Sequence, residues 1–144
     1  MTLSVGTTAP AFTTVDDEGN SVSLSDFQGK TVVLYFYPKD DTPGCTKQAQ
    51  SFRDNFTEYQ NKDMVVLGVS MDDRASHQKF KEKYGLPFKL LVDSDGTITK
   101  AYDVDGGGYA QRVTYIIDGS GEISKVDSNI NTSTHATDIL SSMS

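Results

Sequence analysis

The sequence of 144 residues contains a single cysteine, Cys45, and no tryptophan. One cysteine cannot close an internal disulfide, so the fold is not a disulfide-stapled secreted scaffold. The two histidines, His77 and His135, lie far apart in the chain, which argues against a zinc site. Whatever chemistry Cys45 performs, it performs without a second thiol from its own chain.

Long apolar runs and an excess of positive charge are also missing. No segment approaches the ~20 apolar residues that a membrane-spanning helix needs. Residues 1–4 show neither the basic nor the apolar part of a secretory signal, so we expect none. The net charge is −7. Because nucleic acids and anionic membranes bind clustered lysine and arginine, neither is an expected partner.

The remaining composition is that of an ordinary globular protein, with 36% hydrophobic and 23% charged residues. At this length we expect one domain that covers residues 1–144. Short apolar runs alternate with amphipathic stretches, which is typical of an α/β fold. The predicted strands are 12–15, 21–24, 31–37, 64–70, 88–92, 113–117 and 122–126, and the predicted helices are 43–60, 73–84 and 134–143. Strands that helices separate pair in parallel and hairpins pair antiparallel, so we expect a mixed sheet.

The segment between the strand at 31–37 and the following helix carries the main functional signal. Thr42 and Pro43 have the pattern of an N-cap followed by proline, which places Cys45 in the first helical turn. A helix N-terminus stabilises a thiolate and lowers the pKa of a cysteine below its free value of about 8.5. Asp40 and Asp41 would repel a thiolate, so a nearby cation is expected. The alternative is a small buried hydrophobe, the usual state of a lone cysteine, and helix position alone leaves the two interpretations evenly matched.

The pattern Pro38-x-x-x-Thr42-x-x-Cys45 matches the active-site motif of the peroxiredoxins, which are thiol peroxidases of thioredoxin-like fold. Nearly the whole chain resembles the peroxiredoxin Q group, also called bacterioferritin comigratory protein. The supporting stretches lie in order at residues 34–40, 68–72, 76–80, 86–91 and 112–118. The resemblance implies a thioredoxin-like α/β domain, with a central mixed sheet flanked by helices and an N-terminal β-hairpin.

The resemblance also implies roles for individual residues. Cys45 would be the nucleophile that attacks one peroxide oxygen and becomes sulfenic acid. Thr42 would hydrogen-bond the peroxide, and Pro38 would pack over the sulfur and limit water access. Arg112 would be the missing cation, because its fixed charge lowers the pKa of Cys45 and orients the peroxide. Taken without the resemblance, Pro38 only ends a strand, Thr42 is a plain N-cap and Arg112 is a solvated surface residue.

The sequence departs from its relatives at two positions near Cys45. Gln50 stands where many members of the group carry a second, resolving cysteine, and Gln48 stands where a glutamate that holds the arginine is common. Gln48 lies on the same helix face as Cys45 and can still hydrogen-bond Arg112. With Gln50 in place of the second thiol, the sulfenic acid must be reduced by an outside thiol. We further expect the helix to be held more rigidly than in two-cysteine relatives, where it must unwind to bring the two sulfurs together.

The resemblance implies a cytoplasmic, monomeric enzyme that reduces hydrogen peroxide and organic hydroperoxides in antioxidant defence. It would use thioredoxin, glutaredoxin or glutathione as reductant and would need no metal or other cofactor. A peroxide sensor or thiol relay with little turnover is the first alternative, and a binding module with an inert buried thiol is the second. His77 is expected on a solvated helix face, and Asp95-Gly96 is expected to form a turn.

Overall fold

The computed structural model describes residues 2–143 and contains the strands and helices that the sequence indicates, with a few differences. The strands are β1 (Thr13–Val15), β2 (Ser21–Ser23), β3 (Thr31–Phe36), β4 (Met64–Ser70), β5 (Lys89–Val92), β6 (Val113–Ile117) and β7 (Ile123–Asp127). The α-helices are α1 (Pro43–Asp54), α2 (Phe56–Asn61), α3 (Arg74–Tyr84), α4 (Thr97–Ala101) and α5 (His135–Ser142), and a 3-10 turn, η1, spans Leu24–Phe27.

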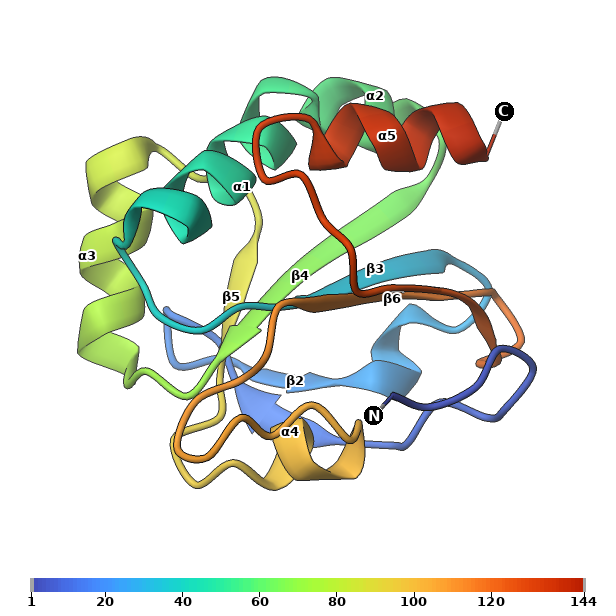
Figure 1. The fold of residues 1–144 in the computed structure, drawn as a ribbon, viewed down its shortest axis with the longest axis horizontal. Helices are drawn as coiled ribbons and strands as arrows, with labels where there is room; N and C mark the ends of the chain where they lie inside the picture. Colours follow the sequence, from blue (N-terminus) through green and yellow to red (C-terminus); the bar gives the residue numbers. More distant parts are fainter. Residues whose placement is uncertain (1, 144) are drawn as a thin grey trace.

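A central sheet of five strands has the order β5-β4-β3-β6-β7 (Figure 1). β3 pairs in parallel with β4, which pairs in parallel with β5. β6 pairs antiparallel with β3 and with β7. The predicted mixed sheet is therefore confirmed, and so is the N-terminal hairpin, in which β1 and β2 form a separate two-stranded sheet.

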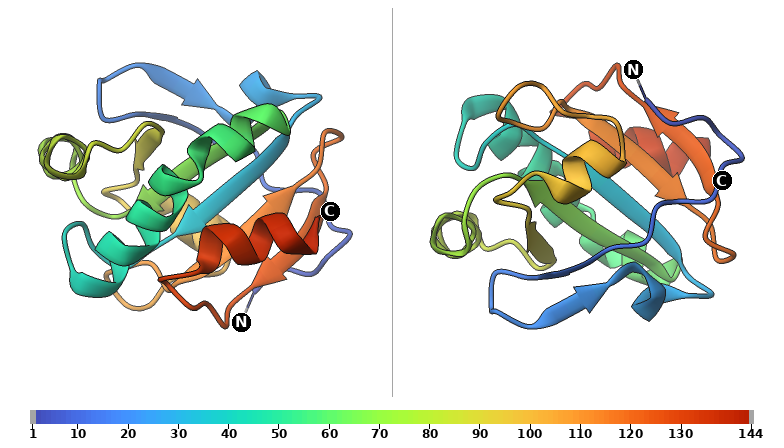
Figure 2. Two further views of the ribbon diagram at one scale, coloured as in Figure 1. Left: turned by 90° about the horizontal axis from the view of Figure 1, so that it is seen from above. Right: turned by 90° about the horizontal axis from the view of Figure 1, so that it is seen from below.

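The helices form two layers around the central sheet. α1, α2 and α5 cover one face, whereas α4 and the N-terminal segment lie against the other (Figures 1 and 2). The side chains of β3 alternate between the two layers: Val33 and Tyr35 join the core under α1 and α5, and Leu34 and Phe36 join the core on the α4 side. Burial on both faces explains why the β3 sequence is continuously apolar.

Two predicted helical features are wrong in detail. The helix expected over 43–60 breaks at Asn55, where α1 ends and α2 begins. The Asn55 side-chain amide donates a hydrogen bond to the Ser51 carbonyl at 2.8 Å, and such local bonds compete with the helical backbone pattern. Met143, expected on the apolar face of the last helix, follows the end of α5 and is 40% exposed.

The short helix α4 is not predicted by the sequence. The expected turn at Asp95-Gly96 is present, and Gly96, with a φ of 76°, leads directly into α4. The buried Asp93 carboxylate accepts hydrogen bonds from the backbone N–H groups of Ile98 and Thr99. These two bonds satisfy donors that a helix start leaves open. Within the described residues, no helix has the length and apolar character to cross a membrane.

Candidate active site

Cys45 lies where α1 begins, just beyond the carboxyl end of the central strand β3. The loop 37–42 joins the two elements, Thr42 is the N-cap in an extended conformation, and Pro43 is the first helical residue. This local structure was predicted. Arg112 arrives from the other side of β3, because β6 runs antiparallel to it and pairs Val113 with Phe36 at that end of the strand. The antiparallel pairing therefore brings the residue before β6 to the start of α1.

Arg112 makes a two-pronged contact at the head of α1. Its Nη2 donates to Cys45 Sγ at 3.3 Å, and its Nη1 donates to Gln48 Oε1 at 2.6 Å. Gly44 leaves room for the guanidinium, since a Cβ at that position would lie 3.1 Å from Nη2. Both sequence expectations, that Arg112 supplies the cation and that Gln48 holds it, agree with this geometry. The planar fork of a guanidinium presents its N–H donors in a fixed geometry and makes the two bonds through different nitrogens.

Gln48 holds the arginine with one end of its amide only. Its side chain is wholly buried, and its Nε2 has no hydrogen-bond partner among the described residues. An amide accepts through its oxygen and donates through its nitrogen, so it cannot offer a second acceptor to Arg112. The positive charge of Arg112 consequently has no carboxylate at this contact and faces Cys45.

Cys45 itself is buried, with 1% of its surface exposed, and belongs to the core cluster under α1. Of the two interpretations that the sequence left open, burial in the core is therefore present, although Cys45 lies in the first turn of α1. Burial alone suits an inert thiol. The direct contact with the fixed positive charge of Arg112 distinguishes Cys45 from a thiol packed only among apolar side chains.

Thr42 and Pro38 frame the same end of β3 from the loop. The Thr42 hydroxyl donates to the Lys39 carbonyl at 2.9 Å and caps no helix N–H, so its expected side-chain capping role is wrong. With its hydrogen used in this way, the oxygen can meet a ligand as an acceptor. Pro38 is half-buried and lines an open pocket with Met71 and Tyr109.

The sequence suggested that the two aspartates of the loop would repel a Cys45 thiolate, but both are paired with other groups. Asp41, at a φ of 58°, accepts hydrogen bonds from Lys83 Nζ at 2.9 Å and Tyr84 Oη at 2.6 Å, both on α3. The Lys83 contact is the main reason that the pKa of Asp41 lies below its usual value. Asp40 is buried and bonds the same helix through Ser76 and His77. Both carboxylates therefore anchor the loop on α3.

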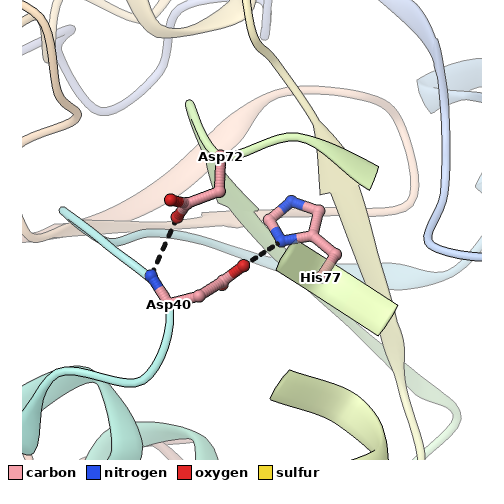
Figure 3. Close-up of side chains that lie close together, drawn as sticks. All are labelled: Asp40, Asp72 and His77. Atoms are coloured by element: carbon pink, nitrogen blue, oxygen red, sulfur yellow. Dashed lines mark hydrogen bonds and ion pairs between the residues drawn. The ribbon is translucent and has the colours of Figure 1, made fainter. Parts of the chain in front are cut away.

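His77 is the functional candidate that sequence reasoning placed wrongly. It is completely buried rather than solvated, and its Nδ1 lies 2.7 Å from Asp40 Oδ2 (Figure 3). A signal was present, because His77, Phe80 and Tyr84 recur at helical spacing and form the inward face of α3. A lone polar residue on such a face has no visible partner in the sequence, since Asp40 is far away along the chain.

Comparison with known proteins gives a consistent picture. The model of the AhpC/TSA family matches residues 5–126. A putative peroxiredoxin bcp of Coxiella burnetii is 45% identical over 148 residues, covering 97% of this chain and 98% of the relative. The crystal structure of peroxidoxin BcpB from Mycobacterium tuberculosis superimposes with a TM-score of 0.91 at 31% identity and covers 98% of this chain and 96% of that one.

A bacterioferritin comigratory protein of Xanthomonas campestris, whose structures were studied for alkyl peroxide reduction, gives a TM-score of 0.86 at 28% identity. The match covers 92% of this chain and 89% of the other.

Proposed function

Since this chain belongs to the AhpC/TSA family and is a thiol peroxidase of the peroxiredoxin Q type, we propose that Cys45, Thr42 and Arg112 carry its reaction, with Pro38 beside them. The observation that carries the proposal is the 3.3 Å contact between Arg112 Nη2 and Cys45 Sγ. A guanidinium at this place favours the thiolate, which is the nucleophilic form of cysteine.

The first half of the cycle is an attack of the Cys45 thiolate on the near oxygen of a hydroperoxide. A sulfur–oxygen bond forms, the oxygen–oxygen bond breaks, and the far oxygen leaves as water or an alcohol after taking a proton. Cys45 is oxidised to the sulfenic acid state and the peroxide is reduced. Negative charge develops on both oxygens, and donors aimed at that charge lower the barrier. Arg112 and the N–H groups at the start of α1 are such donors. The Thr42 oxygen accepts a hydrogen bond from the O–H group of the peroxide.

The second half requires a thiol from another molecule, because Cys45 is the only cysteine in the sequence. An outside thiol attacks the sulfenic sulfur, water leaves, and a mixed disulfide forms. A second thiol then releases reduced Cys45 and carries away the disulfide. Thioredoxin, glutaredoxin and glutathione are the proposed reductants. We also propose hydrogen peroxide and organic hydroperoxides as substrates, a single domain over residues 1–144, a monomer and a cytoplasmic site of action.

Intact mass spectrometry after less than one equivalent of peroxide tests this proposal. We expect wild-type protein to gain one oxygen atom and the Cys45→Ser variant to gain none. Separate additions of thioredoxin with its reductase, glutaredoxin with glutathione, or glutathione alone should then identify the thiol that removes the oxygen. A single oxidation that every thiol fails to reverse would indicate a sensor, and no oxidation at all would indicate an inert buried thiol.

A further inference from the structure

A buried group of polar side chains lies behind the active-site loop, between β3 and α3. Asp40 Oδ1 accepts a hydrogen bond from Tyr37 Oη at 2.5 Å. Asp40 Oδ2 accepts one from Ser76 Oγ at 2.8 Å and faces His77 Nδ1 at 2.7 Å. The backbone N–H of Asp40 donates to Asp72 Oδ2 at 2.8 Å (Figure 3). Through Asp40, the loop that leads to Thr42 is thus tied to two other segments of the chain, α3 and the segment after β4.

The protonation of His77 follows from its partners. Its Nε2 lies 2.8 Å from the Leu91 carbonyl, which can only accept, so Nε2 carries a hydrogen. Three titratable groups face the ring: Asp40 from the loop, Tyr37 from the start of the same loop just after β3, and Asp72 from the segment after β4. Burial lowers the pKa of His77, but the hydrogen bond and charge of Asp40, the Leu91 carbonyl and the charge of Asp72 outweigh it and leave the pKa raised. A raised pKa favours the imidazolium, which donates from both nitrogens.

Asp40, Asp72 and His77 offer ligand atoms within 4.8 Å of one another, a spacing that a metal ion could use. Hydrogen bonds already occupy these atoms. Asp72 Oδ2 accepts from Ser70 Oγ and from the Asp40 N–H, and both nitrogens of His77 are engaged. The arrangement is therefore an ion pair between His77 and Asp40, which hydrogen bonds to Asp72 and the Leu91 carbonyl hold in place.

We propose that His77 is a positioning residue whose charge neutralises buried Asp40, so that Asp40 can anchor the active-site loop without opposing the Cys45 thiolate. Asp40 is 7% exposed and Cys45 is 1% exposed, so solvent screens the charges poorly. Tyr37 links the two groups, because its hydroxyl donates to Asp40 and its ring belongs to the same core cluster as Cys45. The proposal rests on the proposed role of Cys45 as nucleophile.

Charge-matched substitutions separate this role from simple packing. In Asp40→Asn, the amide can still accept from Tyr37 and can donate to a neutral His77, so both the geometry and the overall neutrality are kept. In His77→Gln, Asp40 keeps its charge but loses the cation. In the double variant, neither charge remains. If charge is what matters, the double variant is better than His77→Gln alone, whereas a packing role makes it equal or worse.

The readout is the rate at which iodoacetamide alkylates Cys45 at neutral pH without peroxide, because the thiolate is the reacting form. We expect alkylation of Cys45 to slow several-fold in His77→Gln, and most of that loss to be recovered when Asp40→Asn is added. His135→Gln is the matched control, since His135 is equally buried but belongs to α5. It should alkylate at the wild-type rate, and thermal melts should show all variants folded.

Nitrogen NMR of the imidazole rings supplies a second readout. We expect His77 to be an imidazolium at neutral pH in the wild type and neutral in Asp40→Asn. A neutral His77 in the wild type, or a double variant as slow as His77→Gln, overturns the proposal. Failure of the proposed function has a different signature: wild-type Cys45 would then react no faster than free glutathione, whatever the variants do.

Discussion

Arg112 Nη2 lies 3.3 Å from Cys45 Sγ, although the two residues are 67 positions apart in the chain. The contact exists because β6 runs antiparallel beside β3, which places the residue before β6 next to the helix that follows β3. The other prong of the guanidinium rests on Gln48 at 2.6 Å. The site therefore depends on one guanidinium group that contacts both the Cys45 sulfur and Gln48, the residue that holds the arginine in place.

Replacing this fork by a point charge should impair peroxide reduction. In Arg112→Lys the ammonium cannot reach Cys45 and Gln48 in the same geometry, so one of the two contacts is lost. We expect the second-order rate constant for hydrogen peroxide, measured by stopped flow, to fall roughly 100-fold, the size of effect seen when one transition-state donor is removed. Arg53→Lys, in the last turn of α1, serves as control, and its rate constant should equal that of the wild type. A wild-type rate in Arg112→Lys would contradict the assigned role.

Replacing Gln48, which holds Arg112, should leave the folding stability nearly unchanged. Gln48→Leu deletes the acceptor for Arg112 Nη1, and it also deletes the buried Nε2 that has no partner among the described residues. The two effects on folding oppose each other, so we expect the free energy of unfolding to change by less than about 1 kcal/mol. The rate constant for peroxide should fall roughly tenfold, because the arginine is no longer held in place.

Urea denaturation and stopped-flow kinetics measure the two quantities. Gln50→Leu, two positions along the same helix, is the matched control and should alter neither. A parallel loss of stability and rate in Gln48→Leu would point to general disruption instead.

Installing a second thiol should change the catalytic cycle. In Gln50→Cys the two cysteines lie five positions apart within α1, which puts their Cα atoms roughly 9 Å apart from helix rise and radius. This separation exceeds the ~7 Å limit for a disulfide, so the start of α1 must unwind before the bond closes. After one equivalent of peroxide we expect mass spectrometry to find an internal disulfide in the variant and sulfenic acid in the wild type.

Amide hydrogen exchange reports the unwinding directly. Oxidised Gln50→Cys should lose protection in the first turns of α1, whereas wild-type protein should keep it in both redox states. Equal exchange in the two oxidised proteins would contradict the expectation that the helix is held more rigidly when the second cysteine is absent.

Acid should destabilise the fold through His135. Burial is the main cause that lowers the pKa of His135 to about 4, against an ordinary value of 6.5. The unfolded state therefore binds the proton more readily, so stability falls as the pH drops from about 6.5 toward 4. We expect this residue to remove about 2 kcal/mol of unfolding free energy between pH 7 and pH 5.

Comparison with His135→Gln isolates this contribution. His77 acts with the opposite sign, because its pKa is raised and its contribution to stability is lost as the pH rises through the folded-state pKa. His77 is present in both proteins, so it cancels in the difference. Urea denaturation at several pH values should show the wild type losing its advantage on acidification. A constant difference between the two proteins would rule out a neutral, buried His135.

The sequence by itself determined most of the strands and helices and their order along the chain. Continuous apolar runs indicate strands buried on both faces, and Thr42, Pro43 and Cys45 indicate a helix start after β3. These signals are local, because each depends on residues a few positions apart. The break at Asn55 and the helix α4 escaped prediction, since each depends on a side-chain hydrogen bond to the backbone that competes with a plausible alternative.

Only the tertiary structure decided the electrostatics around Cys45. The sequence places Asp40 and Asp41 a few positions before Cys45, and their negative charges would repel a thiolate. Folding turns both onto α3, where His77 and Lys83 face them. Charge pairing depends on distances of a few ångström between segments far apart in the chain. Such distances exist only once the strands have chosen their neighbours, which is why the environment of the sulfur could not be read from the sequence.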